Sequence, residues 1–407
     1  MRAPFWRSFA VGMTTALALV GAASSAAGQG LAGFSDSLGW HVFYVGADYH
    51  IHELCFSNGN WSNQDLTLAG HAVVNASNLD RLVSLADGDG EQVFYVGTDM
   101  HVHRLSSNNS PWQDLDVTGA ARSSVLATDG LTGFSDVIGE HLFYIGLRDG
   151  HAHLLSGNGS TWSEGDLTAR EATAVQPGVF GHLTSFNDGN GWHVFYVAQD
   201  GHVHELWFHC VLFYRICISL WENVDMTAVA RSTTLASAAS TSFADANGEH
   251  VFYLDVPDAS GASHIHQLVS TNGTAWVDQD LTAFGRYPPT YYPDMTGFSD
   301  RWGEHLFYEG GDTDVHQLYN GLISWWDQDL TQLAANTAPG SNPVPILGCF
   351  IGASYTDASG GEHLFYFGID NDIHGLLLAD FTSSRWVDEN LTSKAGGVGP
   401  LRYCYVP

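Results

Sequence analysis

The chain has 407 residues, of which 44 are acidic and 14 are basic, and its formal net charge at pH 7 is −30. Such a negative field repels phosphate backbones and anionic lipid head groups, so nucleic acids and membrane surfaces are excluded as partners. Neutral or cationic ligands remain. The five cysteines are too few and too scattered for a disulfide framework, although one or two bridges can form.

The first residues have the pattern of a secretory signal peptide. Arg2 and Arg7 precede an apolar run from Phe9 to Val20, and small residues follow it. We expect cleavage between Ala22 and Gly30, assign residues 1–28 to the leader, and predict a secreted, extracellular protein. No later segment is long and apolar enough to span a bilayer, so no membrane insertion is expected. Six glycosylation sequons fit an exported glycoprotein, at Asn60, Asn75, Asn108, Asn158, Asn272 and Asn390.

A Phe-Tyr pair recurs about every 50 residues through the rest of the chain. Its seven copies are Phe43-Tyr44, Phe94-Tyr95, Phe143-Tyr144, Phe195-Tyr196, Phe252-Tyr253, Phe307-Tyr308 and Phe365-Tyr366. Each copy lies in a unit of four β-rich runs, which read in order LTGFSD-like, EHLFY- or WHVFY-like, HVHEL-like, and a tryptophan followed by a DLT-like triplet. Gly, Asn or Asp bounds each run, and no window has a competing helical period.

Four short strands repeated seven times are typical of a β-propeller. We therefore predict an all-β fold, a seven-bladed β-propeller of four-stranded antiparallel blades, built by residues 31–407 as one domain. A six-bladed ring with one divergent unit outside it is the alternative. The tail from Leu401 to Pro407 reads as an extra strand that pairs with blade one or blade seven.

The fourth unit departs from the others. Fourteen residues, WFHCVLFYRICISL, separate Leu206 from Trp221 and contain no turn residue. The segment Phe208–Leu220 is either an elongated hairpin or an error of the gene model, and we assign it no function.

One aspartate ends the first run of every unit in a context close to S-x-D-x-x-G. These residues are Asp36, Asp87, Asp136, Asp188, Asp245, Asp300 and Asp357. They resemble the Asp boxes of sialidase propellers, which are turns that hold a blade together and do no chemistry. They are therefore not evidence for an enzyme.

A His-x-His pattern marks the third run. Its second histidine occurs in every unit, as His52, His103, His153, His204, His266, His316 and His374. Residues i and i+2 of a strand share a face, so His50 and His52 together offer two metal ligands. A residue identical in every blade more economically serves as a buried hydrogen-bonding group, and the repeat offers no second set of ligands. We therefore expect framework histidines without metal.

Units one and four share two departures from the repeat. Each has a tryptophan before the histidine of the second run, giving Trp40-His41 and Trp192-His193. Each also has a glutamate after the invariant histidine, at Glu53 and Glu205. A binding site must break the pattern of the scaffold somewhere, so these two units are the candidate site units.

At WHVFYV followed by HIHELCFSNGNW, the chain resembles the fungal fucose-specific lectins, which are β-propellers. In that family an arginine of the second strand and a glutamate of the third bind sugar hydroxyls between adjacent blades, and an aromatic ring stacks on the sugar. The resemblance implies a carbohydrate-binding protein. The family's arginine position holds histidine or Gln92 here, its glutamate survives only as Glu53 and Glu205, and its ring has six blades.

We therefore predict a lectin, not an enzyme, that recognises neutral glycans or glycoproteins, fucose-containing ones among them. The expected carbohydrate-binding residues are Trp40, His41, Glu53, Trp61, Trp192, His193, Glu205 and Trp221, with no catalytic residue, metal or cofactor. Planar groups that make paired hydrogen bonds and aromatic rings suit sugars, and several weak sites gain avidity. A glycoside hydrolase or sialidase-like propeller and a protein-interaction scaffold are the alternatives, although no unit has a unique acid pair and the arginines are scattered.

The register of one hairpin decides whether the histidine and the glutamate act together. A two-residue turn at Asp200-Gly201 would pair Tyr196 with Glu205 and place His193 on the opposite face. A three-residue loop with Gly201 in the left-handed region would pair Phe195 with Glu205 and place His193 and Glu205 on one face. The resemblance to the fucose-specific lectins requires the second register, and we therefore predict it in units one and four.

Overall fold

The structure, a computed structural model, describes residues 30–401 except 78–80, 89, 109–110, 129, 159–160, 171–173, 179–181, 214–215, 260, 271–274, 285–294, 322–323, 338–344 and 379–384. For 211–213, 216–217, 239–240, 337 and 347–351 it describes the backbone alone. The leader assigned to 1–28, the end of the tail at 402–407 and the sequon at Asn272 lie outside the described residues.

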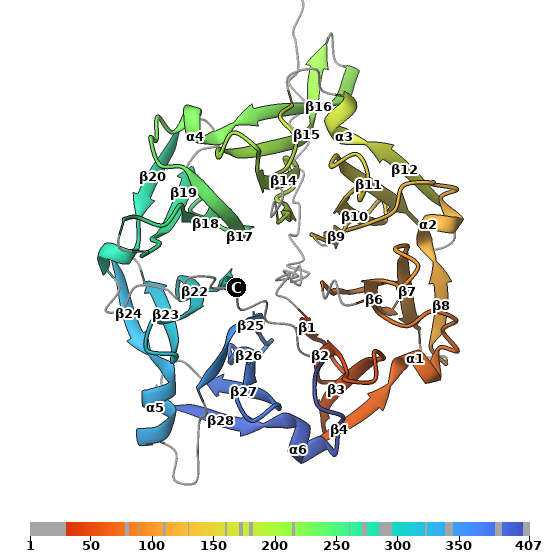
Figure 1. The fold of residues 1–407 in the computed structure, drawn as a ribbon, viewed down its shortest axis with the longest axis vertical. Helices are drawn as coiled ribbons and strands as arrows, with labels where there is room; N and C mark the ends of the chain where they lie inside the picture. Colours follow the sequence, from red (N-terminus) through yellow and green to blue (C-terminus); the bar gives the residue numbers. More distant parts are fainter. Residues whose placement is uncertain are drawn as a thin grey trace, which may run out of the picture.

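The described strands form seven four-stranded antiparallel sheets that close into a ring (Figure 1). Blade 1 comprises β1 (Leu31–Ser35), β2 (Trp40–Val45), β3 (Ile51–Ser57) and β4 (Asn60–Asp65). Blade 2 comprises β5 (Val83–Asp87), β6 (Gly90–Val96), β7 (Val102–Ser107) and β8 (Gln113–Asp116). Blade 3 comprises β9 (Thr132–Ser135), β10 (Glu140–Ile145), β11 (Ala152–Gly157) and β12 (Trp162–Asp166).

The remaining four blades repeat this order. Blade 4 comprises β13 (Thr184–Asn187), β14 (Gly191–Val197), β15 (Val203–Phe213) and β16 (Ile216–Asp225). Blade 5 comprises β17 (Ala236–Ala244), β18 (Glu249–Asp255), β19 (Ile265–Ser270) and β20 (Trp276–Asp280). Blade 6 comprises β21 (Met295–Ser299), β22 (Glu304–Glu309), β23 (Val315–Asn320) and β24 (Trp325–Asp329). Blade 7 comprises β25 (Ile346–Thr356), β26 (Glu362–Gly368), β27 (Ile373–Leu378) and β28 (Trp386–Asn390).

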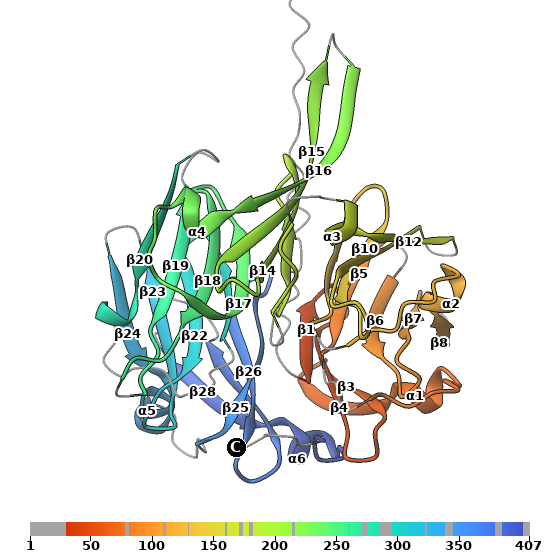
Figure 2. The same ribbon diagram turned by 45° about the horizontal axis from the view of Figure 1, so that its top comes forward.

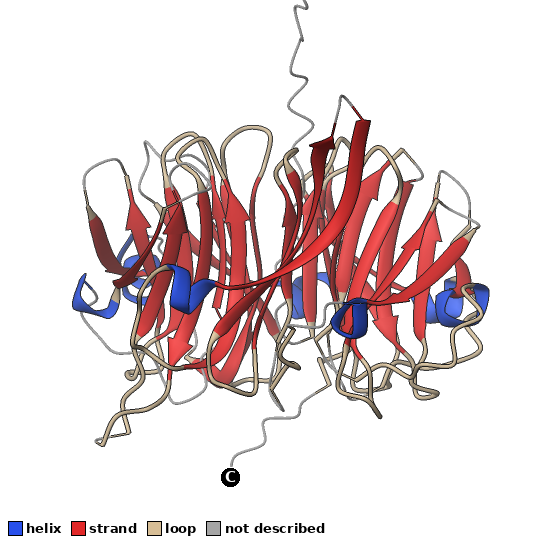
Figure 3. Cartoon of the chain, turned by 90° about the horizontal axis from the view of Figure 1, so that it is seen from above, coloured by secondary structure: helices blue, strands red, loops and turns tan. Residues whose placement is uncertain are grey.

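The predicted seven-bladed propeller is confirmed, and the six-bladed alternative is wrong. Within each blade the strands pair in chain order, from the innermost at the ring centre to the outermost at the rim (Figure 1). Seen from the side, the strands run through the thickness of the ring (Figure 3). None of the helices in the described ranges is long and apolar enough to cross a membrane.

Short helices that the strand pattern did not predict follow the outermost strands. They are α1 (Leu66–Ala69), α2 (Val117–Ala120), α3 (Leu167–Arg170), α4 (Met226–Val229), η1 (Thr282–Phe284), α5 (Leu330–Thr337) and α6 (Leu391–Ala395).

The DLT triplet explains these helices. In blade 1, Asp65 caps α1 by accepting a hydrogen bond from the backbone of Leu68, and Leu66 is fully buried. The hydroxyl of Thr67 accepts the backbone N–H of Ile51 at 2.8 Å. The triplet therefore ends the blade, starts one helical turn and ties it to the third strand.

The Phe-Tyr pair builds the core between blades. Adjacent residues of a strand point to opposite faces, so Phe43 packs against blade 2 and Tyr44 packs against blade 7. Both side chains are fully buried. One apolar cluster of this kind fills each blade boundary, which we name by the two blades it joins.

The long segment of unit four forms the elongated hairpin. Strands β15 and β16 continue their antiparallel pairing as far as Phe213 and Ile216, and the hairpin projects beyond the ring (Figures 2 and 3). Cys210 is disulfide-bonded, whereas Cys55 of β3 is a free thiol.

Candidate functional site

The second strand of six blades carries a buried histidine that is tied to the aspartate at the end of the first strand. In blade 1, Nε2 of His41 lies 3.2 Å from Oδ1 of Asp36. The same carboxylate accepts the backbone N–H groups of Leu38 and Gly39. In blade 2 the side chain of Gln92 replaces the histidine and donates to Asp87. The Asp-box interpretation is therefore confirmed in its geometry, because these aspartates hold a turn and a framework ring.

The register that we predicted is observed in both candidate units. Phe195 pairs with Glu205, and Gly201 has a φ of 79°. The backbone of Ala198 pairs with that of His202, which leaves a loop of three residues between them. In blade 1, Phe43 pairs with Glu53 in the same way. Histidine and glutamate therefore share one face of each sheet.

The two pairs make short contacts inside the protein. Nδ1 of His193 lies 2.6 Å from Oε1 of Glu205, and Nδ1 of His41 lies 2.6 Å from Oε1 of Glu53. Burial opposes a charge on the His193 ring, but hydrogen bonds with Asp188 and Glu205 outweigh it and raise the pKa of His193 to about 9. The same kind of balance raises the pKa of His41. The His193 ring is therefore an imidazolium at neutral pH.

At three other boundaries, the third-strand residue at the Glu53 position donates to a glutamate of the next blade. Nε2 of Gln267 donates to Glu304, and Nε2 of Gln317 donates to Glu362, each at 3.0 Å. Arg104 donates to Glu140 at 3.2 Å. At boundaries 2/3, 5/6 and 6/7, a donor on one blade thus satisfies an acceptor on the next.

Boundaries 1/2 and 4/5 break this rule because both partners are acids. Glu53 and Glu205 stand where blades 2, 5 and 6 carry donors, and the next blades present Glu91 and Glu249. In the described part of the chain, no side chain donates a hydrogen bond to Glu91 or Glu249.

The pKa values of Glu91 and Glu249 are raised, in part because other acids lie close to them. Burial raises the pKa of Glu91, the His41 ring opposes the rise, and the carboxylate of Glu53 adds to it. Burial likewise raises the pKa of Glu249, with His193 opposing and Glu205 adding. Each of the two boundaries therefore holds more hydrogen-bond acceptors than the protein supplies with donors.

The four predicted tryptophans do not join these histidine–glutamate pairs. Trp40 precedes His41, so it points to the opposite face, where its ring lies 4.2 Å from the ring of His363 in blade 7. Trp192 lies 3.9 Å from the ring of His141 in blade 3 and donates to Asp136. Trp61 is buried at boundary 7/1 and Trp221 is buried at boundary 3/4, next to Trp40 and Trp192 respectively.

The composition of the preceding blade explains these tryptophans. At boundaries 7/1 and 3/4 the third strand offers Gly375 or Leu154, which cannot donate to an acid on the next blade. A tryptophan takes the place that glutamate has elsewhere and covers the neighbouring histidine. The expectation that Trp40 and Trp192 share a site with Glu53 and Glu205 needs correction, because consecutive strand residues face different blades.

Trp207 is the aromatic residue that the sequence analysis missed. It pairs with His193 across β14 and β15, on the face that also carries Glu205. Its half-buried ring stacks on the His193 ring with centroids 6.0 Å apart and on His209 at 3.6 Å. The signal was its position two residues after Glu205, which strand alternation places on the same face. Blade 1 has Cys55 at this position, so boundary 4/5 is the more complete of the two.

No protein-family model matches the chain, and no curated protein matches it in sequence. Among solved structures, the SapL1 lectin in complex with α-methyl fucoside is 12% identical, with a TM-score of 0.45, over 76% of this chain and 94% of that chain. The Aleuria aurantia lectin, described as a six-bladed β-propeller with a novel mode of fucose recognition, is 12% identical, with a TM-score of 0.45, over 80% and 96%. A protein provisionally described as a 6-phosphogluconolactonase from Bacteroides uniformis is 10% identical, with a TM-score of 0.47, over 84% and 91%. These likenesses concern the fold, so a function has to come from the side chains at the blade boundaries.

Proposed function

We propose that this protein is a secreted lectin whose ring binds neutral glycans, with its principal site at boundary 4/5. The observation that carries the proposal is the group formed there by Glu205, Glu249 and the half-buried ring of Trp207 around His193. Acceptors that lack protein donors suit a ligand rich in hydroxyl donors, and an aromatic ring suits the apolar face of a sugar.

The same boundary explains why the site is selective for a neutral ligand. Asp188, Glu205 and Glu249 gather around one imidazolium, so a carboxylated or phosphorylated sugar would meet like charges. Glu205 is 5% exposed and serves mainly to orient His193. Glu249 and Trp207 are only partly buried and are the groups that a sugar reaches. Boundary 1/2, with Glu91 but no equivalent of Trp207, is a weaker second site.

A glycan array followed by monosaccharide titration tests the proposal. The full mature chain is expected to bind neutral glycans, with fucosylated ones included because of the sequence resemblance. Trp207→Ala should weaken binding at least about fivefold, because stacking on an aromatic ring contributes roughly 1 kcal/mol or more. Glu249→Gln should weaken binding as well, because it replaces an acceptor by a group that is half donor.

Trp326→Ala is the matched control, because Trp326 is an exposed aromatic residue of blade 6 outside any boundary group. It should bind as the unaltered chain does. The absence of any glycan bound on the array, or equal binding by the Trp207 and Trp326 variants, would rule out this site.

A further inference from the structure

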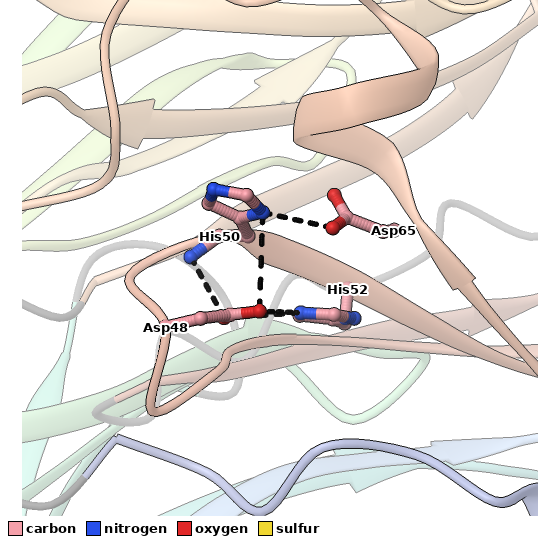
Figure 4. A group of neighbouring side chains, drawn as sticks. All are labelled: Asp48, His50, His52 and Asp65. Carbon is pink, nitrogen blue, oxygen red and sulfur yellow. Dashed lines mark hydrogen bonds and ion pairs between the residues drawn. The ribbon is translucent and has the colours of Figure 1, made fainter.

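The first blade holds a group of two imidazoles and two carboxylates away from the boundary site (Figure 4). Asp48 lies in the turn between β2 and β3, His50 and His52 lie at the start of β3, and Asp65 ends β4. One ligand atom from each of these residues lies within 4.8 Å of the other three. The sequence analysis found no second ligand set for the His-x-His pattern, and the fold supplies it with Asp48 and Asp65.

The spacing of the donor atoms fits a small tetrahedral ion. Bonds of about 2.0–2.1 Å to zinc place two tetrahedral ligands about 3.3 Å apart. Nε2 of His52 lies 3.2 Å from each carboxylate oxygen of Asp48. Nδ1 of His50 lies 2.8 Å from Oδ2 of Asp65 and 3.9 Å from Oδ2 of Asp48. These separations bracket the tetrahedral value, and all four ligand atoms lie within 4.8 Å of one another.

Backbone contacts already orient both carboxylates. Oδ1 of Asp48 accepts the N–H of His50, and Oδ1 of Asp65 accepts the N–H of Leu68. This leaves Oδ2 of each turned toward the His50 ring. The side chains of Asp48, His50 and Asp65 are 37%, 22% and 21% exposed, whereas His52 is 3% exposed. The group is therefore buried on the His52 side and reaches solvent on the side of Asp48, His50 and Asp65.

Blade 3 repeats the set with Asp149, His151, His153 and Asp166. Nε2 of His153 faces Asp149 at 3.2 Å, and its Nδ1 lies 2.7 Å from Glu164. A neutral imidazole has one N–H, so one of these two contacts would bring a lone pair against a carboxylate. When Nδ1 donates to Glu164, a proton or a metal ion must lie between Nε2 and Asp149. A carboxylate behind a ligating histidine is also the usual outer partner in metal sites.

We propose that these groups in blades 1 and 3 bind a divalent transition metal ion of the zinc type. Two imidazoles and two carboxylates suit Zn²⁺ and related ions, whereas Ca²⁺ and Mg²⁺ prefer oxygen ligands alone. The net charge of −30 raises the local concentration of any cation.

Blade 7 shows how the same place is built without two histidines. Asp372 stands at the position of His50, and Asn390 stands at that of Asp65. Nδ2 of Asn390 donates to Asp372 at 2.7 Å, and its side-chain oxygen still caps α6. Asparagine at the end of the fourth strand is therefore compatible with the fold.

Titration with Zn²⁺ and Co²⁺ tests the proposal on the mature chain, purified without a histidine tag and treated with a chelator. Calorimetry counts the bound Zn²⁺, and the visible absorption of Co²⁺ reports tetrahedral coordination. Asp65→Asn with Asp166→Asn should remove two equivalents of bound Zn²⁺ relative to the unaltered chain. His50→Gln with His151→Gln should do the same by a different route. His71→Gln, at an exposed histidine outside these groups, should remove none.

The stoichiometric difference between variants is the deciding quantity, because other blades also carry His-x-His. Loss of two equivalents of bound Zn²⁺ in both double variants supports the assignment, provided that the variants unfold at the same temperature as the unaltered chain. An unaltered chain that binds no Zn²⁺, or double variants that bind as many equivalents as the unaltered chain, would overturn it. Glycan binding is not a readout here, so this result and that of the boundary site are independent.

Discussion

His193 is the residue on which boundary 4/5 depends. It lies between Asp188, at 3.2 Å from its Nε2, and Glu205, at 2.6 Å from its Nδ1. The partnership also lowers the pKa of Asp188 to about 2, because the hydrogen bonds from His193 and neighbouring groups outweigh the effect of burial. Either carboxylate alone would be a buried charge without a partner, which is costly.

This triad makes stability depend on pH in a defined direction. The pKa of His193 is about 9 in the folded protein, whereas its ordinary value is 6.5. The stabilisation that the charged ring provides is therefore complete below pH 6.5 and is lost as the pH rises through 9. The free energy of unfolding should therefore fall between pH 6.5 and pH 9. Denaturant titrations across this range measure it.

His193→Gln tests that assignment at the same residue. A glutamine amide can donate a hydrogen bond to Asp188 or to Glu205, but this bond is weaker than one from an imidazolium. Gln92 at the same position of blade 2 shows that the amide fits the fold. We expect a loss of about 1–3 kcal/mol at pH 6 and a smaller loss at pH 9. An equal loss at both values would mean that the ring acts without its charge.

At the scale of elements, the closing triplet connects the outermost strand, the one-turn helix and the third strand. In blade 4, Asp225 caps α4, and the hydroxyl of Thr227 accepts the N–H of Val203 at 2.9 Å. Val203 is the first residue of β15 and is fully buried. Its N–H has no neighbouring strand residue to bond, so the threonine supplies the acceptor.

Thr227→Val should lower the free energy of unfolding by about 1–3 kcal/mol, because it keeps the shape of the side chain and leaves a buried N–H without an acceptor. Thr227→Ser keeps the oxygen and should cost less. Urea unfolding of the two variants compares them. The same loss in both would assign the effect to the methyl group and not to the hydrogen bond.

At the scale of the whole molecule, the described strands close the ring without one that the first and last blades share. Each blade is built from consecutive residues, so packing joins blade 7 to blade 1. The segment after α6 adds a link that repeats those between other blades. Pro400 bridges Gly46 as Ala76 bridges Gly97 in the next blade. Leu401, the one described residue of the expected tail, donates its backbone N–H to Val45 of blade 1, whereas 402–407 lie outside the described residues, so the extra strand stays a prediction.

A chain that ends at Gly397 should unfold at a temperature several degrees lower than one that ends at Leu401. The shorter chain loses the hydrogen bonds of Tyr44 with Val398, of Ala47 with Gly399 and of Leu401 with Val45. Each contributes about 1 kcal/mol. Differential scanning calorimetry of the two chains measures the difference. Equal unfolding temperatures would show that packing alone closes the ring.

The sequence by itself determined the number of blades and the four strands of each, because the seven Phe-Tyr pairs and the alternation of strand faces are local signals. The turn residues left two registers open for the third-strand hairpin, and the lectin resemblance selected the one that is observed, with Gly201 left-handed. The short helices after the fourth strands were not predicted, because one or two turns are too short for a helical period to be recognised, although a DLT-like triplet marks each of them.

Only the tertiary structure decided which groups meet across a boundary. Trp40 and His41 are neighbours in sequence, yet Trp40 packs against blade 7 and His41 faces blade 2. The acid pairs of Glu53 with Glu91 and of Glu205 with Glu249 join residues from separate sheets, as does the fit of Trp192 against His141. Such contacts depend on how one independently formed sheet packs on the next, and no short-range pattern in the chain records that packing.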